Sequence, residues 1–321
     1  MNRLSLTLAA YFLLTAAVHA QPKPATPAAV DAEVIRLQVA LDRAGFSAGV
    51  IDGRSGANTT RALDAFKAQN NREPDLAGDP LIDYVVTPED AAGPFVENLP
   101  SDLLEQSKLP ALSYRGVDEM LAERFHTTPQ TLKALNAAAT FAAGETIKVP
   151  NVEPMAIRPT PPPGEPAAVG TTGGAPAKPL PDAGPQVVVR VSRASGSLTA
   201  TSTDGKILLF APVTMGSEHD PLPIGEWKVN GVQYNPTFRY NPELFWDANP
   251  AHTKAKIPPG PNGPVGVVWI DISKEHYGLH GSPEPSQIGR SESHGCVRLT
   301  NWDAMRLAGL VRPGTQVVFT E

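Results

Sequence analysis

Only one cysteine, Cys296, occurs among the 321 residues, so the chain cannot form an internal disulfide bond. The thiol is therefore a packing group, a metal ligand or a reactive group. A free cysteine usually packs as a small apolar side chain, but Cys296 stands in the sequence SHGCVR at 293–298, among polar and basic neighbours. Such surroundings favour the thiolate, and we predict a reactive cysteine.

A long apolar run is absent beyond the first residues. Residues 1–20 combine a basic start, an apolar stretch from Leu4 to Val18 and a small residue before Gln21, which predicts a cleaved secretory signal peptide. No other segment offers the roughly 20 apolar residues of a membrane helix, and no cysteine near Gln21 is available for lipid attachment. We therefore expect an exported protein without an integral membrane segment after signal removal. A thiol enzyme in an oxidising compartment benefits from having no second cysteine.

Blocks of like charge are absent as well. The net charge is −6, from 27 Lys and Arg against 33 Asp and Glu, and this dispersed composition argues against nucleic acid as a partner. A structural zinc site usually takes two or more cysteines at short spacing. The one candidate set, Cys296 with His276, His280 and His294, lacks them, so the sequence predicts no metal.

Proline, by contrast, is abundant, and its 34 copies are unevenly spread. Residues 152–185 hold a dense group of prolines together with Gly170, Gly173 and Gly174, which predicts a semi-extended linker. This linker divides the chain into a helix-rich N-terminal part and a strand-rich C-terminal part. Each part is large enough for a domain or a pair of small modules.

The N-terminal part begins with two predicted helices. Apolar residues recur at helical spacing from Val34 to Ala44, and a second helix carries Leu63 and Phe66 beyond a tight turn at 52–53. In this order, residues 31–72 resemble the small helical peptidoglycan-binding module. The matching positions are Leu37, Gln38, Leu41, Gly45, Phe46, Gly49, Asp52, Gly53, Gly56, Thr59, Ala62 and Phe66. Nearly all are turn or core positions, so the alternative is a spacer that keeps the fold and has lost wall binding.

Residues 112–151 show a second pattern. A short strand is predicted near Leu112–Tyr114, helices from Val117 to Phe125 and from Pro129 to Asn136, and a closing strand in the sequence GETIKVP at 144–150. This order resembles a LysM module, which implies binding to glycans that contain N-acetylglucosamine. Residues 73–111 read as a connecting segment with a short acidic helix at Asp102–Ser107.

From residue 186 onward, short β-branched segments alternate with period two between turn residues. These segments predict a mainly β sandwich or barrel-like domain over 186–321. They are 187–191, 197–200, 206–209, 227–229, 267–270 and 316–319. One helix is predicted directly after the cysteine motif, because Thr300 begins a capping-box pattern and Trp302, Met305 and Leu310 form an apolar face. The other large aromatic residues, Trp246, Trp269 and Tyr277, are expected to pack in the core.

Two motifs of this domain identify a family. The sequences HGS at 280–282 and SHGCVRL at 293–299 resemble the signature of the L,D-transpeptidase catalytic domain, also called YkuD-like. The likeness extends to PLPIGEW at 221–227, where Leu222 replaces the usual threonine, and to GPVG at 263–266. It covers residues 186–321 and implies a cysteine acyltransferase acting on peptidoglycan.

The catalytic residues follow from the chemistry and from this resemblance. Cys296 is the predicted nucleophile, and a neighbouring imidazole raises its thiolate fraction by taking the proton. His280 is the predicted base, because the glycine after it gives the ring room. The carbonyl of Gly281 is free to hold the ring tautomer, the role that the resemblance also assigns to it.

Four further residues are assigned to the oxyanion and substrate sites. The N–H groups of Gly295 and Cys296 are the natural donors to an oxyanion. His294, too close to the nucleophile to swing freely, shapes the donor pocket. Arg298 either holds a stem-peptide carboxylate or fixes the loop, and Ser293 either donates a hydrogen bond near the site or turns the loop.

The resemblance implies a peptidoglycan L,D-transpeptidase. The thiolate attacks the tetrapeptide stem, D-alanine leaves, and the acyl group passes from the thioester to an amine, a reaction that needs no cofactor. The acceptor is left open between another stem, a free D-amino acid and a wall-anchored lipoprotein. Two alternatives are an L,D-carboxypeptidase, which releases the thioester to water, and a non-catalytic wall-binding protein, against which the intact His280 and Cys296 count.

Overall fold

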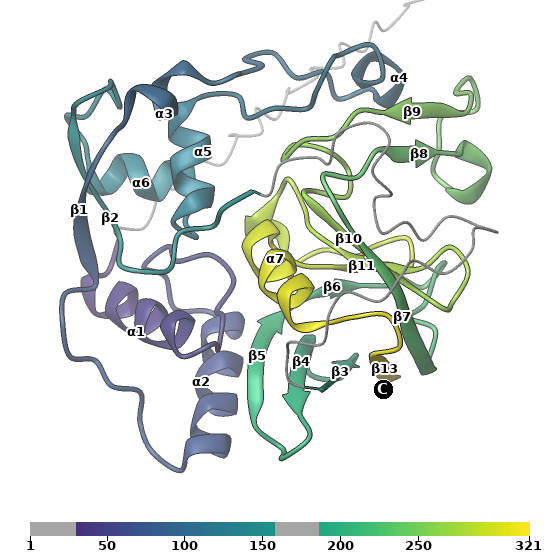
Figure 1. Cartoon of the computed structure of the whole chain (residues 1–321), viewed down its shortest axis with the longest axis horizontal. Coiled ribbons are helices and arrows are strands. Elements are labelled where there is room, and N and C mark those ends of the chain that lie inside the picture. Colours follow the sequence, from purple (N-terminus) through teal and green to yellow (C-terminus); the bar gives the residue numbers. More distant parts are fainter. Residues whose placement is uncertain (1–29, 158–185) are drawn as a thin grey trace, which may run out of the picture.

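The computed structural model describes residues 30–157 and 186–321 (Figure 1). The predicted signal peptide and residues 158–185 of the predicted linker lie outside these ranges. The helices are α1 (Ala32–Arg43), α2 (Ala57–Asn70), α3 (Pro88–Ala92), α4 (Leu103–Gln106), α5 (Val117–Arg124), α6 (Pro129–Leu135) and α7 (Asn301–Leu310). The strands are β1 (Leu81–Val85), β2 (Thr146–Pro150), β3 (Val187–Ser192), β4 (Ser197–Ser202), β5 (Ile207–Pro212), β6 (Thr214–Met215), β7 (Gly225–Tyr234), β8 (Phe238–Tyr240), β9 (Ala255–Ile257), β10 (Val268–Ile272), β11 (Gly278–His280), β12 (Val297–Arg298) and β13 (Gln316–Thr320).

The C-terminal domain, residues 186–321, is organised around one nine-stranded sheet in the order β5-β4-β3-β13-β7-β10-β11-β12-β6. The strands at the two ends of this order, β5 and β6, follow each other in the chain with Val213 between them, so the sheet curls back toward its own edge. Its enclosed side holds a core of valine, leucine and isoleucine side chains. These findings confirm the predicted mainly β, barrel-like fold.

The helix predicted after the cysteine motif is confirmed as α7. Thr300 caps it, because the threonine hydroxyl accepts a hydrogen bond from the backbone N–H of Asp303 at 3.2 Å. Leu307 and Ala304 of α7 are buried in the core of the sheet. α7 begins at Asn301, a few residues after Cys296. Contacts that fix the start of α7 therefore also limit the movement of the cysteine loop.

The first two helices, α1 and α2, confirm the predicted helical pair. Asp31 caps α1, its carboxylate accepting hydrogen bonds from backbone N–H groups of the first turn. The buried Gln38 ties α1 to the following turn, because its side-chain oxygen accepts from the N–H groups of Asp52 at 3.0 Å and Gly53 at 2.9 Å. These contacts explain why a glutamine and an Asp-Gly turn stand at these positions.

The next unit, which we call the middle module, consists of β1, α5, α6 and β2. β1 and β2 pair antiparallel. Leu121 of α5, Phe125 directly after α5 and Leu132 of α6 pack with Ile147 and Val149 of β2. The predicted helices at 117–125 and 129–136 are therefore confirmed, as is the short helix after Asp102, which is α4. The LysM resemblance of this module stays a prediction.

The predicted strand at Leu112–Tyr114 is wrong. The first strand of the middle module is β1, inside the segment that the sequence presented as a connection. Leu112 instead donates its N–H to the carbonyl of Pro259 at 2.9 Å and accepts from the N–H of Asn262 at 3.0 Å. The extended residues around Leu112 thus bind the C-terminal domain and not a strand of their own module.

The N-terminal half packs directly on the C-terminal domain, whose helix α7 lies at the boundary between the two (Figure 1). Phe46, after α1, forms a parallel bridge with Phe210 of β5, and the two rings stack at 6.3 Å. The N–H of Ser47 donates to the carbonyl of Phe210 at 2.9 Å, and the N–H of Phe210 donates to the carbonyl of Gly45 at 2.8 Å. Since β5 ends the sheet order, this loop covers an otherwise open strand edge.

The beginning of the predicted linker belongs to the packed structure. Met155 is 8% exposed, donates its N–H to the carbonyl of Arg124 at 2.8 Å, and packs with Val50 and Trp302. Trp302 in turn stacks on His126 of the middle module at 5.2 Å. These contacts tie the start of the predicted linker to the middle module and to α7, and the division of the chain at 152–185 stays a prediction.

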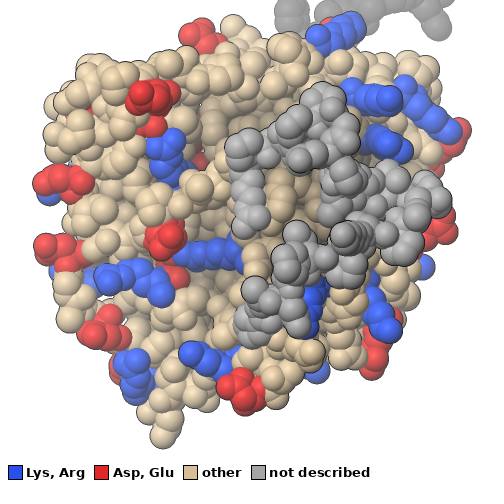
Figure 2. Space-filling model, viewed as in Figure 1, with Lys and Arg blue, Asp and Glu red and all other residues tan. Residues whose placement is uncertain are grey.

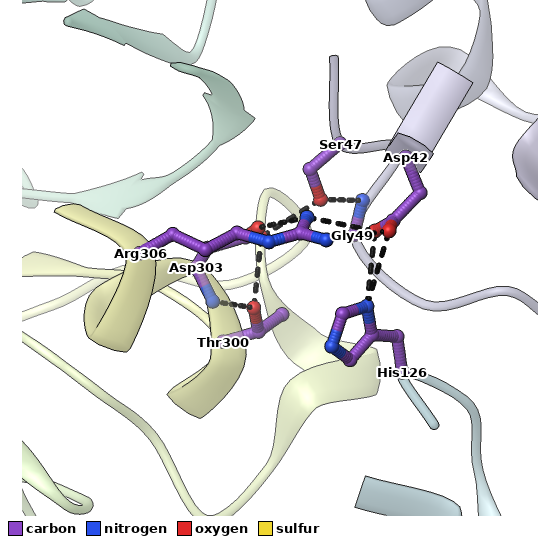
Figure 3. Close-up of polar contacts among 7 residues, drawn as sticks. All are labelled: Asp42, Ser47, Gly49, His126, Thr300, Asp303 and Arg306. Carbon is purple, nitrogen blue, oxygen red and sulfur yellow. Dashed lines mark hydrogen bonds and ion pairs between the residues drawn. The ribbon is translucent and has the colours of Figure 1, made fainter. Parts of the chain in front are cut away.

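A buried polar cluster, which we call the module junction, joins all three units (Figure 3). Asp42 of α1 accepts hydrogen bonds from both terminal nitrogens of Arg306 on α7, at 2.7 and 3.0 Å. The same carboxylate lies 3.1 Å from Nδ1 of His126. Ser47 completes the junction by donating its hydroxyl to Asp303 of α7 at 2.8 Å.

The two carboxyl groups of the module junction differ in their pKa. Burial opposes ionisation of Asp42, yet His126 and Arg306 together hold the pKa of this carboxyl below its usual range. Burial raises the pKa of Asp303 to about 7. Asp42 is therefore the carboxylate that neutralises Arg306, and Asp303 takes up a proton as the pH falls through about 7.

The visible surface carries mixed charges. Figure 2 shows Lys and Arg side chains interspersed with Asp and Glu side chains over this face. Within the described ranges, no helix has both the length and the apolar character needed to cross a bilayer.

Candidate active site

Two short strands bring the halves of the predicted motif together. β11 ends at His280 and pairs in parallel with β12, which begins directly after Cys296; Leu279 lies opposite Val297, and His280 opposite Arg298. Alternate residues of a strand point to opposite faces. Leu279 and Val297 enter the core, so the alternation assigns His280, Arg298 and Cys296 to the other face.

His280 is buried, and its ring is hydrogen-bonded to the backbone of the next residue. Its Nδ1 donates a hydrogen bond to the carbonyl of Gly281 at 2.7 Å, which leaves Nε2 as the basic atom, and the ring stacks on Trp269 at 5.4 Å. Burial, aided by the nearby charge of Arg298, lowers the pKa of His280 to about 3. The ring is therefore neutral near pH 7 and able to accept a proton.

Cys296 is partly exposed, with its sulfur 3.8 Å from the carbonyl oxygen of His276. Burial raises the pKa of its thiol, and this effect outweighs the hydrogen bond with the backbone of Gly278 and the attraction of Arg298, both of which favour the thiolate. The expectation that basic neighbours favour a resting thiolate is therefore wrong. The Cys296 thiol and the His280 imidazole are therefore both uncharged at rest near pH 7.

The pH dependence of thiol reactivity follows from these two shifts. We expect the rate of Cys296 alkylation by iodoacetamide to rise with pH through an inflection above the ordinary thiol pKa, since burial raises that pKa. No inflection is expected near pH 6.5, because the pKa of His280 lies at about 3. A pH series of alkylation rates measures this, and a plateau already reached at pH 7 would reveal a resting thiolate–imidazolium pair instead.

The cysteine loop is shaped by two of the predicted residues. Ser293 donates its hydroxyl to the carbonyl of Cys296 at 2.6 Å, so of its two predicted roles the contact matches the turn of the loop. Gly295 has a φ of +96°, and a Cβ there would lie 2.5 Å from Cε1 of Tyr277. Both facts require glycine at this position, with the loop passing close to the aromatic ring.

His294 lies on an aromatic rim beside the loop. Its Nε2 lies 2.8 Å from a carboxylate oxygen of Asp247, and its ring contacts Phe245 at 5.1 Å and Trp246 at 5.9 Å. Trp246 is 59% exposed, so the expectation that it packs in the core is wrong. The geometry separates the two histidines: His280 is buried at a strand end, and His294 lines a surface edge.

Arg298 lies opposite His280 on the same face of the strand pair. Its Nε is buried and has no hydrogen-bond partner among the residues that the structure describes. Burial lowers the pKa of this guanidinium from its ordinary value, but a guanidinium stays charged at neutral pH. An unfilled buried donor of this kind is suited to a carboxylate ligand.

Sequence reasoning gave no role in the site to three residues of this region, one of which, Trp269, was expected only to pack in the core. Trp269 stacks on His280, Asp247 holds His294, and Asn301 accepts a hydrogen bond from the N–H of Val267 at 3.1 Å. A correct prediction of the pairing of β10 with β11 would have identified Trp269, because Trp269 lies opposite His280. No sequence pattern near Asp247 or Asn301 indicates that these residues contact the site. Across 30–157 and 186–321, no three His, Cys, Asp or Glu side chains gather as a metal site.

Two models of known protein families match this sequence. Residues 186–319 match the model of the "L,D-transpeptidase catalytic domain" (YkuD), and residues 30–75 match that of the "Putative peptidoglycan binding domain". The chain therefore carries a YkuD-type L,D-transpeptidase catalytic domain preceded by a peptidoglycan-binding domain. This confirms the family resemblance drawn from the two sequence motifs.

Individual relatives carry the same family name. The "Putative L,D-transpeptidase YkuD" of Bacillus licheniformis is 48% identical over 62 residues, which are 19% of this chain and 38% of the relative. Its counterpart from Bacillus subtilis is 30% identical over 129 residues, 40% of this chain and 63% of the relative. The chain thus spans less than two thirds of either relative. A solved L,D-transpeptidase 3 from Mycobacterium tuberculosis is similar at 20% identity and a TM-score of 0.36, over 43% of this chain and 61% of that one.

Proposed function

We propose that the protein is a peptidoglycan L,D-transpeptidase with Cys296 as its nucleophile. The sulfur forms a bond to the carbonyl carbon of the third stem residue, and the bond from that carbon to the nitrogen of D-alanine breaks. His280 takes the thiol proton and gives it to the leaving amine. The nitrogen of an acceptor amine then bonds to the thioester carbon, the carbon–sulfur bond breaks, and His280 passes the proton of the amine to the sulfur, which restores the thiol.

The observation that carries this proposal is the register of β11 and β12. His280 ends β11 and Cys296 directly precedes the neighbouring β12, so alternation along the strands favours the same face of the sheet for both, within a domain that matches the L,D-transpeptidase catalytic model. The hydrogen bond from Nδ1 to the carbonyl of Gly281 supports the base role, because it leaves Nε2 free for the proton.

The remaining predicted residues have roles in binding. The N–H groups of Gly295 and Cys296 stabilise the oxyanion of the tetrahedral intermediate. Arg298 holds a stem carboxylate, supported by its unfilled Nε. His294, with Asp247 and the exposed Trp246, forms the wall of the donor pocket, supported by their mutual contacts.

The two histidines are expected to respond differently to substitution. His280→Ala removes the proton acceptor, so alkylation of Cys296 by iodoacetamide at pH 7 should slow by roughly 10²-fold or more. His294→Ala should leave the alkylation rate within a factor of a few and raise KM for a soluble tetrapeptide, since it removes a contact with substrate. Alkylation as fast in His280→Ala as in the parent would refute the base assignment.

Peptidoglycan is the proposed partner of both the helical module and the catalytic domain. A cleft along α1 is lined by Arg36, Arg43 and Arg72 together with Asp75 and Asp79. Arg36 donates to the carbonyls of Leu76 and Gly78, and the guanidinium groups of Arg43 and Arg72 suit the carboxylates of stem peptides. This cleft, with the family match of residues 30–75, supports wall retention by the helical module. The site of action is accordingly the periplasm or cell wall.

Product analysis tests the proposal. Purified protein incubated with soluble tetrapeptide muropeptides should release D-alanine and give cross-linked dimers, or adducts with an added D-amino acid, by mass spectrometry. Tripeptide products alone would assign the protein as an L,D-carboxypeptidase. Unchanged muropeptides, from protein whose thiol still reacts with iodoacetamide, would leave a non-catalytic wall-binding protein.

A further inference from the structure

Asn301, the first residue of α7, lies fully buried against the turn that follows His280. Its Oδ1 accepts the N–H of Val267 at 3.1 Å. A Cβ placed on Gly281, or on Gly266, would lie 2.0 Å from the same oxygen. The asparagine therefore fills the space between two backbone segments, one of which supplies the carbonyl that fixes the tautomer of His280.

The amide nitrogen of Asn301 is bound by a residue outside the catalytic domain. Its Nδ2 donates to Oε1 of Glu123 at 2.6 Å and to the carbonyl of Pro261 at 3.2 Å. Glu123 is on α5 of the middle module and is 6% exposed. Tyr114 also hydrogen-bonds this carboxyl, whose pKa burial raises to about 8. At neutral pH, Glu123 is thus mostly uncharged and serves Asn301 as an acceptor.

These contacts define one orientation of the amide. Oδ1 faces the backbone N–H of Val267, and Nδ2 faces the backbone carbonyl of Pro261 as well as Glu123, so a flipped Asn301 would set its oxygen against that carbonyl and its nitrogen against that N–H. Loss of the Glu123 acceptor leaves Nδ2 with the longer bond to Pro261 and weakens the preference for this orientation. The turn at Gly281 then loses its fixed support.

We propose that Glu123 and Asn301 are positioning residues for His280, so that the middle module completes the active site. Glu123 fixes the amide of Asn301, Asn301 fixes the Gly281 turn, and the turn fixes the ring of His280. This role rests on the proposed function, since it matters through the base. The middle module is then a structural part of the catalytic centre in addition to any binding to glycan.

Three variants of the full mature chain test this. Glu123→Leu removes the acceptor and keeps an apolar side chain of similar size; Glu123→Gln keeps an acceptor oxygen for Nδ2. Asp118→Asn is the matched control, because Asp118 lies on the same helix and pairs with Lys133 of its own module. Each is assayed for Cys296 alkylation at pH 7, for kcat and KM on a soluble tetrapeptide, and for thermal unfolding.

We expect Glu123→Leu to lower kcat and the alkylation rate roughly tenfold, since misplacing a catalytic group by a fraction of an ångström already slows reaction, while KM stays within twofold. Glu123→Gln and Asp118→Asn should match the parent. Parent-like alkylation in a folded Glu123→Leu would overturn the proposal, as would an equal loss in Asp118→Asn. If Glu123→Leu does not fold, Glu123→Asp, which withdraws the oxygen by one methylene, is held to the same outcomes.

The test separates this proposal from the proposed function. A parent that forms no peptidoglycan product, with alkylation still slowed in Glu123→Leu, would refute the function and retain the positioning role. A parent that forms product, with alkylation and kcat unchanged in Glu123→Leu, would retain the function and refute the positioning role.

Discussion

Replacement of Cys296 by alanine is expected to abolish all transfer of stem-peptide acyl groups and all covalent labelling by a carbapenem, the inhibitor class that the family resemblance implies. The physical reason is that Cys296 is the only thiol in the sequence. No other side chain in the SHGCVR loop offers a comparable nucleophile, because serine needs an adjacent base, and Ser293 instead donates its hydroxyl to the carbonyl of Cys296. The measurement is intact-protein mass spectrometry after incubation with a carbapenem, together with muropeptide analysis.

The control for this variant is its binding to purified sacculi. The helical module lies outside the catalytic domain, so Cys296→Ala should still pellet with sacculi as the parent does. A labelled adduct on the alanine variant would show a second nucleophile and contradict the mechanism. Loss of both labelling and sacculus pelleting would point to a misfolded protein, and thermal unfolding distinguishes that case.

The largest effect on stability is expected from Asp42→Ala. The carboxylate is 1% exposed and is the near partner of Arg306, at 2.7 and 3.0 Å, and of His126, at 3.1 Å. Breaking a buried pair leaves a charge without compensation, so we expect a loss of roughly 3 kcal/mol in the free energy of unfolding. Denaturant unfolding at pH 7 measures this. Because the contacts of Phe46 with Phe210 and of Met155 with Trp302 still join the N-terminal units to the C-terminal domain, the transition should stay a single cooperative one.

Asp83→Ala provides the comparison. Asp83 forms an ion pair with Lys148 on the surface, with a side chain 62% exposed, and such pairs contribute little. The two substitutions remove the same groups and differ in burial and partners. Equal unfolding midpoints for the two variants would mean that the module junction does not hold the units together.

Patterns within a few residues of each other predicted much of the fold. Strands β3, β4 and β5 follow from β-branched residues at period two between turns, and α7 follows from the cap at Thr300 before an apolar face. Cys296 and His280 were identified for a similar reason, because each lies in a short motif whose chemistry can be inferred from the sequence alone. Their approach to each other depends on the pairing of β11 with β12, which no local pattern specifies.

Features that depend on distant partners were missed. The residues around Leu112 alternate like a strand, but alternation does not say whether the partner is a strand of the same module or the loop at Pro259 of another domain. The pKa of Cys296 was misjudged because basic sequence neighbours favour the thiolate, whereas burial by distant residues outweighs them. The contact between Glu123 and Asn301 joins residues 178 positions apart.

The central claim is that Cys296 forms a thioester with the stem peptide. Its most direct test is intact-protein and peptide mass spectrometry of the parent, quenched in acid shortly after mixing with a soluble disaccharide tetrapeptide in the absence of an added amine. The account predicts one adduct with the mass of the substrate less D-alanine, located on the peptide that contains Cys296, and free D-alanine in solution. An adduct on another residue, or the release of D-alanine with no dependence on Cys296, would contradict it.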